Sequence, residues 1–279
     1  MFRYLSYIIG FFIFSLGSIT DFRKREVPDY INYSFIIFAV LLRIFWFFES
    51  KDFRHLIFPV IWGSLFYIIS LIFCHAKIWG GGDSKALIAS AVLFSYFPME
   101  GEIPFFVYFV VNVFFYGAVY SVFYCTIIAL KNYKKLAVVF SKDNKLILAF
   151  ILPWVLAMPL MFIFRDMSKI FFVFAVFINI TLLLKIVEDE FFYKFVNSKE
   201  LVEGDWIVNT IKINGKVVYD SKKEPYVEKK HLKLLKNYGK KIKIREGVPF
   251  IPSFLIGLLM TIMNKTAVID WIIGFVPVL

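Results

Sequence analysis

Long apolar runs dominate this chain and leave few folds open to it. Hydrophobic residues make up 60% of its 279 residues, aromatic residues make up 20%, and the mean hydropathy is +0.73. A helix needs about 20 apolar residues to cross the roughly 30 Å hydrocarbon core of a bilayer, and it satisfies its own backbone hydrogen bonds there. The sequence therefore predicts an all-α polytopic membrane bundle of about six to eight transmembrane helices.

The apolar runs predict eight spans and one further apolar stretch. The predicted spans cover residues 4–20, 31–48, 56–78, 85–97, 104–130, 146–164, 170–187 and 250–263. Pro98 is expected to end the short fourth span, because the residue before a proline disfavours helix. The stretch 267–279 contains Asp270 and Pro277, and we expect it to be re-entrant or interfacial. The first 20 residues carry Arg3 but no small-residue cleavage signal, so we interpret them as a retained anchor helix.

The basic residues predict which way the chain is inserted. If the N-terminus lies outside, most of the 32 Lys and Arg residues fall in inside loops, including Arg23, Lys24 and Arg25. Lys and Arg favour the cytoplasmic side of a membrane. The net charge of +11 is then a property of basic cytoplasmic loops, and we predict a lipid bilayer and no nucleic acid as partner.

The composition changes between residues 188 and 248, where charged residues replace the apolar runs. The stretch DWIVNTIKINGKVVYD alternates apolar and polar residues around Asn214-Gly215, a dipeptide that favours the turn of a β-hairpin. Residues 227–235 are expected to form a short helix. We predict a membrane helical domain (1–187), a small cytoplasmic α+β domain (188–248) whose basic balance suits anionic headgroups, and a C-terminal membrane segment (249–279).

Two carboxylates fall at the ends of predicted spans. Asp21 lies at the cytoplasmic end of the first span and Asp83 at the cytoplasmic start of the fourth, so both lie on one side at a similar depth. Like charges held close together favour one shared proton. The ionised carboxylate can then take a proton from water while the protonated one polarises a carbonyl, which is the chemistry of aspartic peptide hydrolysis.

Three glycines stand directly before the second aspartate. Gly80, Gly81 and Gly82 permit positive φ and lack a Cβ, so an extended substrate peptide could lie against bare backbone there. Asp83 or Ser84 is expected to cap the helix that follows.

Other chemistries fit the sequence less well. The histidines His55, His75 and His231 lie at different predicted depths, and Cys74 and Cys125 form no CxxC pair. We therefore predict no metal ion and no cofactor. The stretch GGGDSK also lacks the GxxxxGK[ST] spacing of a phosphate-binding loop.

Plainer interpretations exist for each motif. GGGD alone is more often a structural helix start, and Asp21 alone more often a boundary carboxylate paired with a nearby arginine. Two other functions stay open: a proton-coupled transporter in which Asp21 and Asp83 carry protons, and a non-enzymatic filament-assembly partner that docks through the basic segment. Acids at one boundary and the absence of a visible inverted repeat speak against the transporter.

Two motifs together resemble a known family. SITDFRKREVPDYIN (18–32), followed by GGGD (80–83), resembles the type IV prepilin peptidases, which are GxGD membrane aspartic proteases, and most of all the archaeal preflagellin and pilin-precursor peptidases. VPFIPSFLIG (248–257) resembles the proline-bearing segment of archaeal members. By resemblance, Asp21 and Asp83 are the catalytic aspartates. The Pro-Ala-Leu motif of presenilin-type GxGD proteases is missing.

The resemblance also implies a substrate and a location. The enzyme would sit in an archaeal cell membrane and cut the short basic leader from precursors of archaellin or pilin-like subunits at the cytoplasmic face. Gly80, Gly81 and Gly82 would bind substrate backbone, and Glu26, Asp29 or the cluster at 188–190 would attract the basic leader. Bacterial relatives that also methylate their product often carry a four-cysteine loop, which this chain lacks, so we predict no methyltransferase activity.

Overall fold

The computed structural model describes residues 1–76, 80–97, 103–142, 144–213, 215–221, 223–224, 226–236, 238–264 and 268. Its contacts divide the chain into two compact units, a first unit of residues 1–120 and 195–279 and a second unit of residues 121–194. The predicted fold class, a mostly helical membrane protein with a small α+β region, is confirmed. The three predicted domain boundaries stay a prediction.

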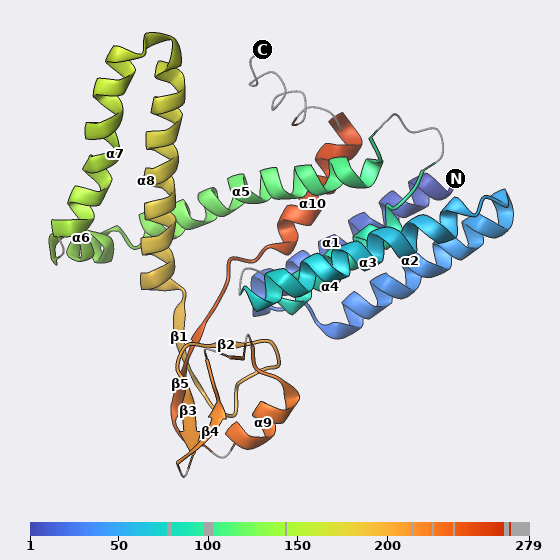
Figure 1. Ribbon diagram of the computed structural model, residues 1–279. Helices are drawn as coiled ribbons and strands as arrows, with labels where there is room; N and C mark the ends of the chain where they lie inside the picture. Colours follow the sequence, from blue (N-terminus) through green and yellow to red (C-terminus); the bar gives the residue numbers. More distant parts are fainter. Residues whose placement is uncertain are drawn as a thin grey trace. The chain divides into compact units, whose positions relative to one another are not determined.

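Helices make up the membrane part of the first unit (Figure 1). They are α1 (Phe2–Lys24), α2 (Asp29–Ser50), α3 (Arg54–His75), α4 (Gly81–Leu93), the first part of α5 (Phe105–Lys131) and α10 (Ile251–Asn264). Helices α2 and α3 pack against α4, and α1 packs against α2, α4 and α10.

Six helices of the described chain are long and apolar enough to cross a membrane: α1, α2, α3, α5 and, in the second unit, α7 (Asn144–Ile163) and α8 (Ser168–Phe191). The other two predicted spans are helices too, but α4 has 13 residues and α10 has 14. At 1.5 Å per residue each reaches only about 20 Å, which is short of the bilayer core.

Aromatic rings join the helices of the first unit. Phe14 of α1 is 1% exposed. Its ring lies 5.3 Å from that of Phe35 on α2, 6.0 Å from that of Phe109 on α5 and 5.5 Å from that of Phe254 on α10, measured between centroids. Such ring pairs add to the burial energy of each side chain. One residue of α1 thus packs against three other helices.

Small residues let α10 approach α5 closely. A Cβ added to Gly257 would lie 2.6 Å from the Cγ2 atom of Val113 and 2.9 Å from its Cα, so only glycine fits there. The Asn112 amide donates a buried 2.9 Å hydrogen bond to the Thr261 hydroxyl across the same contact. Close backbones and interhelical hydrogen bonds are the usual means by which helices associate in membranes.

A buried arginine holds the C-terminal end of α4. Arg43 of α2 is 1% exposed, and its guanidinium donates to the backbone carbonyls of Val92, Leu93 and Tyr96. These carbonyls belong to the last helical turn and the residues after it, which lack intrahelical partners. A cation also complements the negative end of the helix dipole. Arg43 therefore stabilises the end of α4 that lies opposite Asp83.

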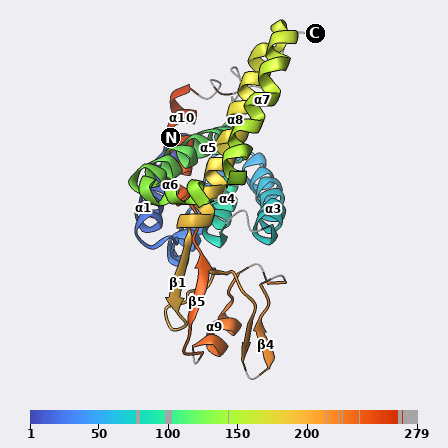
Figure 2. The same cartoon turned by 90° about the vertical axis from the view of Figure 1, so that its left-hand side faces the viewer.

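The α+β region has a core of its own (Figure 2). A sheet runs in the order β1 (Tyr193–Asn197), β5 (Lys241–Arg245), β2 (Trp206–Ile207), and α9 (Lys229–Leu235) packs against β4 (Lys216–Tyr219). The predicted hairpin is confirmed: β3 (Ile211–Ile213) pairs antiparallel with β4, and Gly215 in the turn has φ +77°. The short helix predicted at 227–235 is confirmed as α9.

The second unit contains α6 (Tyr133–Lys142), α7, the 3₁₀ turn η1 (Arg165–Met167) and α8. Helices α7 and α8 form an antiparallel hairpin (Figure 1) with Ala157 and Ala175 buried, and an apolar cavity of about 420 Å³ lies between them. The stretch between the predicted spans 104–130 and 146–164 was not expected to be helical, but it contains α6. Its lysines and its apolar residues lie on different faces of the helix. This helical period was overlooked because the stretch was interpreted from its charges alone.

Candidate functional site

Asp21 lies in the last turn of α1 and is bound by the start of another helix. Its carboxylate is 6% exposed, and its Oδ2 atom accepts a 3.0 Å hydrogen bond from the backbone N–H of Ile251. The backbone N–H of Phe250 donates to it as well, and the Arg25 guanidinium interacts with it electrostatically. Arg25 in turn donates to the carbonyl oxygen of Gly247 at 3.4 Å. The segment that leads into α10 thus donates backbone hydrogen bonds to Asp21 and also binds Arg25.

Asp83 lies in the first turn of α4. The helix begins at Gly81 with Gly80 in the N-cap position, and the Gly80 backbone N–H donates to the Asp83 carboxylate. In a capping box, the side chain at the third helical position accepts a hydrogen bond from the backbone N–H of the N-cap residue, and Asp83 has this role here. The helix starts earlier than expected, so Gly80 holds the N-cap position and Asp83 caps the helix from its third position. Ser84 instead contacts the Cys74 sulfur at 3.1 Å.

The three glycines differ in what surrounds them. None uses a positive φ; in the described chain the left-handed glycines are Gly204, Gly215 and Gly239. A Cβ at Gly82 would meet Val27 at 3.4 Å, and one at Gly80 would meet the Asp83 Oδ2 atom at 3.6 Å. A Cβ at Gly81 would meet nothing within 4 Å. The helix start is therefore open at Gly81 and packed on the loop after α1 at Gly82.

The structure brings Asp21 and Asp83 to the same end of the bundle. Their carboxylates interact electrostatically, and α1 contacts α4. Val27, six residues after Asp21, packs on Gly82, next to Asp83. Two acids from distant parts of the sequence thus share one environment, with hydrogen-bond donors that come from different helices.

The two acids considered for leader binding, Glu26 and Asp29, lie in the loop after α1 and at the start of α2. Asp29 is the first residue of α2 and forms an ion pair with Lys85, which also lies over the ring of Tyr33. Glu26 is half-buried in the loop. A carboxylate already paired with a lysine attracts a basic peptide less strongly than an unpaired one, so the structure favours Glu26 over Asp29 for that role.

Two buried polar side chains of the motif at 18–32 were not singled out from the sequence. The Ser18 hydroxyl lies one turn before Asp21 on the same helix, and the Asn32 amide lies in the first turns of α2. Among the described residues, neither the Ser18 oxygen nor the Asn32 nitrogen has a hydrogen-bond partner. Ser18 could have been found from the sequence, because residues three apart on a helix lie on the same face and Ser18 stands three residues before Asp21.

The remaining sequence candidates lie elsewhere. Glu190 pairs with Lys135 at 3.3 Å within the second unit.

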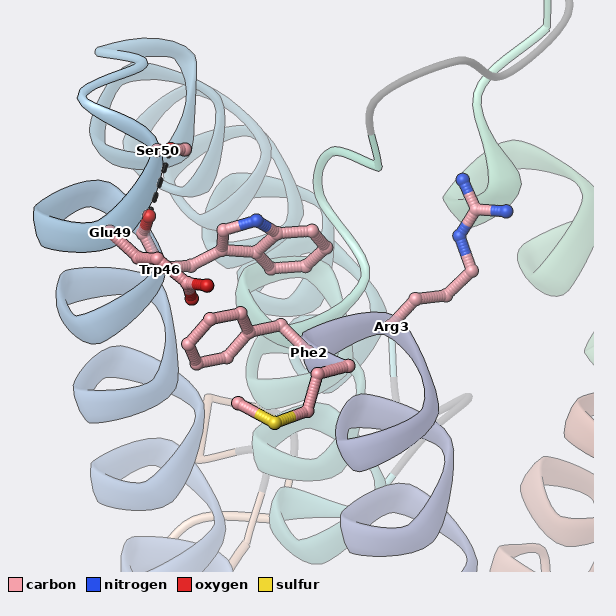
Figure 3. A pocket seen from close by; sticks show the side chains of 6 residues that line it. Phe2, Arg3, Trp46, Glu49 and Ser50 are labelled. Carbon is pink, nitrogen blue, oxygen red and sulfur yellow. Dashed lines mark hydrogen bonds between the residues drawn. The ribbon is translucent and has the colours of Figure 1, made fainter.

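A cavity of about 390 Å³ is lined by residues at the beginning of α1 and the end of α2, at the end of α1 opposite Asp21 (Figure 3). There the ring of Phe2 stacks on Trp46 and Arg3 points away from both. Asp270 and Pro98 lie outside the described residues.

Comparisons with known proteins find similarity over the N-terminal part of the chain. Residues 8–122 match the type IV leader peptidase family. The chain is also 34% identical over 95 residues to a preflagellin peptidase of Methanococcus maripaludis, a match that covers 34% of this chain and 41% of that protein. No solved structure matches the chain. Asp21, Asp83, most of α1 and all of α4 fall within residues 8–122. The N-terminal region of this chain, residues 8–122, therefore belongs to the type IV leader peptidase family.

Proposed function

We propose that the chain is a membrane-embedded aspartic endopeptidase that cuts the short basic leader from precursors of archaellin or pilin-like filament subunits. The observation that carries this proposal is the meeting of Asp21 and Asp83 at one end of the helical bundle, inside the region matched to leader peptidases. The orientation expected from Lys and Arg puts this end at the cytoplasmic face.

The proposed reaction uses the pair as base and acid. A water molecule attacks the scissile carbonyl carbon and gives one proton to the ionised carboxylate, while the protonated carboxyl donates its proton to the carbonyl oxygen. When the tetrahedral intermediate collapses, the C–N bond breaks, the leaving amine takes the proton held by the first carboxylate, and the second carboxyl regains its own. The pair ends as it began, so no metal or cofactor takes part.

The substrate would reach the pair along bare backbone. Gly81 offers exposed main chain beside Asp83, where an extended peptide can approach without meeting a side chain. Gly80 and Gly82 flank that opening. Glu26 in the loop after α1 would attract the basic residues of the leader, and Asp29 at the start of α2 would add to this more weakly because it is paired with Lys85.

Cleavage of a purified precursor by purified protein tests this function. Mass spectrometry should show the leader released by the wild-type protein, and Asp21→Asn and Asp83→Asn should each lower the rate by at least about a hundredfold. Asp52→Asn is the matched control, since Asp52 lies in the loop between α2 and α3 and pairs with Arg54. Full activity of either site variant would reject the proposal.

A further inference from the structure

The start of α10 is capped by a side chain from another helix. The residue before it, Phe250, has no side-chain acceptor, and the second residue of the helix, Pro252, has no N–H. The N–H groups of Phe250 and Ile251 are instead bound by the Asp21 carboxylate. The first N–H groups of a helix have no partner within it, and its N-terminus carries partial positive charge. Asp21 therefore satisfies donors that α10 itself leaves open.

The two aspartates differ in how they are held. Asp83 receives a hydrogen bond from Gly80, within its own helix start. Asp21 receives its hydrogen bonds from a segment 230 residues away, and the neighbouring Arg25 reaches the same segment through Gly247. Backbone N–H donors favour the ionised form of a carboxylate and fix its direction. This difference distinguishes the two partners of the pair.

We propose that the Ile251 backbone amide is a positioning group for the reaction, which orients Asp21 as the ionised base, leaving Asp83 as the acid. The inference rests on the proposed function and deepens it, since the residues matched to the family end before α10. The group acts through Asp21 and touches no substrate. The segment from Gly247 to Ile251 is then a part of the site that lies far from both aspartates in the sequence.

A proline tests the amide itself. Ile251→Pro removes the N–H at the first position of the helix, where proline is well accepted because that N–H has no partner within the helix. Ile251→Val is the matched control: it has as many side-chain carbons as proline and keeps the donor. The Cγ2 methyl of Ile251 lies 3.1 Å from where a Cβ of Gly17 would stand, and valine keeps this methyl whereas proline does not.

The two variants should differ in rate and in pH dependence. Relative to Ile251→Val, Ile251→Pro should lower kcat by about ten- to a hundredfold, the range expected for a hydrogen bond to a charged group, with little change in KM. The acidic limb of its pH–rate profile should move up by about one pH unit, because a carboxylate with one donor fewer takes up a proton more readily. Equal kcat values and coincident profiles would overturn the positioning role.

Two further measurements test the positioning role if Ile251→Pro misfolds, and they separate a failure of this role from a failure of the proposed function. If Ile251→Pro fails to fold, an ester in place of the 250–251 peptide bond removes the same N–H with no change of side chain, and the same profile shift is expected. Melting temperatures of Ile251→Pro, Asp21→Asn and the double variant form a cycle that should show coupling. Additive effects would refute the contact whatever the activity. If the wild-type protein cleaves no precursor, the proposed function fails and the positioning role falls with it.

Discussion

At the scale of single residues, substrate binding should depend on the open backbone at one glycine and on the charge of one acid. Gly81 is the one motif glycine whose missing Cβ would meet no described atom within 4 Å, whereas Gly80 and Gly82 contact Asp83 and Val27 at ordinary distances. If bare backbone matters for substrate, it matters at Gly81.

Gly81→Ala separates a role in binding from a role in folding. Alanine fits the space and is the better helix former, so the melting temperature should stay the same or rise, by the equivalent of about 0.5–1 kcal/mol at most. The new methyl group would stand where the peptide approaches, so KM for the precursor should rise severalfold. Melting curves and cleavage kinetics on one preparation check both. Unchanged kinetics would remove Gly81 from the substrate path.

Lys85 should decide how much charge Asp29 offers to a substrate. Lys85→Met frees Asp29 from its ion pair, so a precursor with a basic leader should bind more tightly, with a lower KM and a steeper loss of binding in salt. Lys230→Met, which removes an exposed lysine paired with Glu228 in the α+β region, is the control. Kinetics at two salt concentrations measure the effect, and a KM that does not respond would exclude Asp29 from leader binding.

At the scale of elements, α4 is a short helix stabilised at both ends. Its N-terminus is closed by Asp83, and its last carbonyls are bound by Arg43. A helix that reaches only part of the way across a bilayer would otherwise leave these groups without water or partner.

Arg43→Lys should destabilise the protein strongly. A lysine has one nitrogen and cannot reach three carbonyls as the planar guanidinium does, so buried acceptors are left open at a cost of about 2 kcal/mol or more. Arg54→Lys, the same change at an exposed arginine, should have little effect. Thermal unfolding in detergent compares the two, and equal melting temperatures would contradict the capping role of Arg43.

The α+β region should respond to alkaline pH through one tyrosine. Tyr219 is 1% exposed and donates to the Glu224 carbonyl at 3.1 Å, and burial raises the pKa of its hydroxyl to about 12. The folded state therefore favours the neutral hydroxyl. Its contribution to stability is complete below the unfolded pKa of about 10 and is lost as the pH rises from there towards 12.

Tyr219→Phe isolates this contribution. The variant should be less stable than wild type at pH 8, by about 1 kcal/mol for the lost hydrogen bond, yet lose less stability between pH 10 and 12. Melting curves of both proteins over that range measure the slopes, with the exposed Tyr30→Phe as the control. Parallel slopes would show that Tyr219 does not titrate in that range.

Most elements could be predicted from the sequence, and the failures have physical causes. The helices at the eight predicted spans, six of them long enough to cross a membrane, follow from local apolar runs, and the hairpin and α9 also follow from local sequence patterns. The contact between Asp21 and Ile251 does not, because it joins residues 230 positions apart through a backbone N–H that has no sequence signal. Arg43 was placed within a span, but the open carbonyls of α4 that give it a role appear only once the helices are packed. The catalytic roles of the aspartates stay a prediction.

At the scale of the whole molecule, the orientation in the membrane follows from the basic loops. Helix α2 has 22 residues and reaches about 33 Å, so the loops before and after it should lie on opposite sides of a bilayer. The exposed basic residues before α2 are expected in the cytoplasm, together with the α+β region.

Cysteine labelling tests this orientation. In a chain with Cys74 and Cys125 replaced by serine, an introduced Lys51→Cys should react with a membrane-impermeant reagent in intact cells. Lys24→Cys and Lys216→Cys should react only after the cells are opened. Labelling of the Lys24 variant in intact cells would place the two aspartates outside, and labelling of the Lys216 variant would place the α+β region outside.

The hydrogen bond between Asp21 and Ile251 also sets an order of events during synthesis. Asp21 leaves the ribosome before its hydrogen-bond donor, which is made 230 residues later, a delay of about 10 to 50 s at ordinary elongation rates. A nascent chain, or one that terminates early, carries both acids but not the amides that orient the first of them. Synthesis of the segment that leads into α10 is thus itself a step in the assembly of the candidate site.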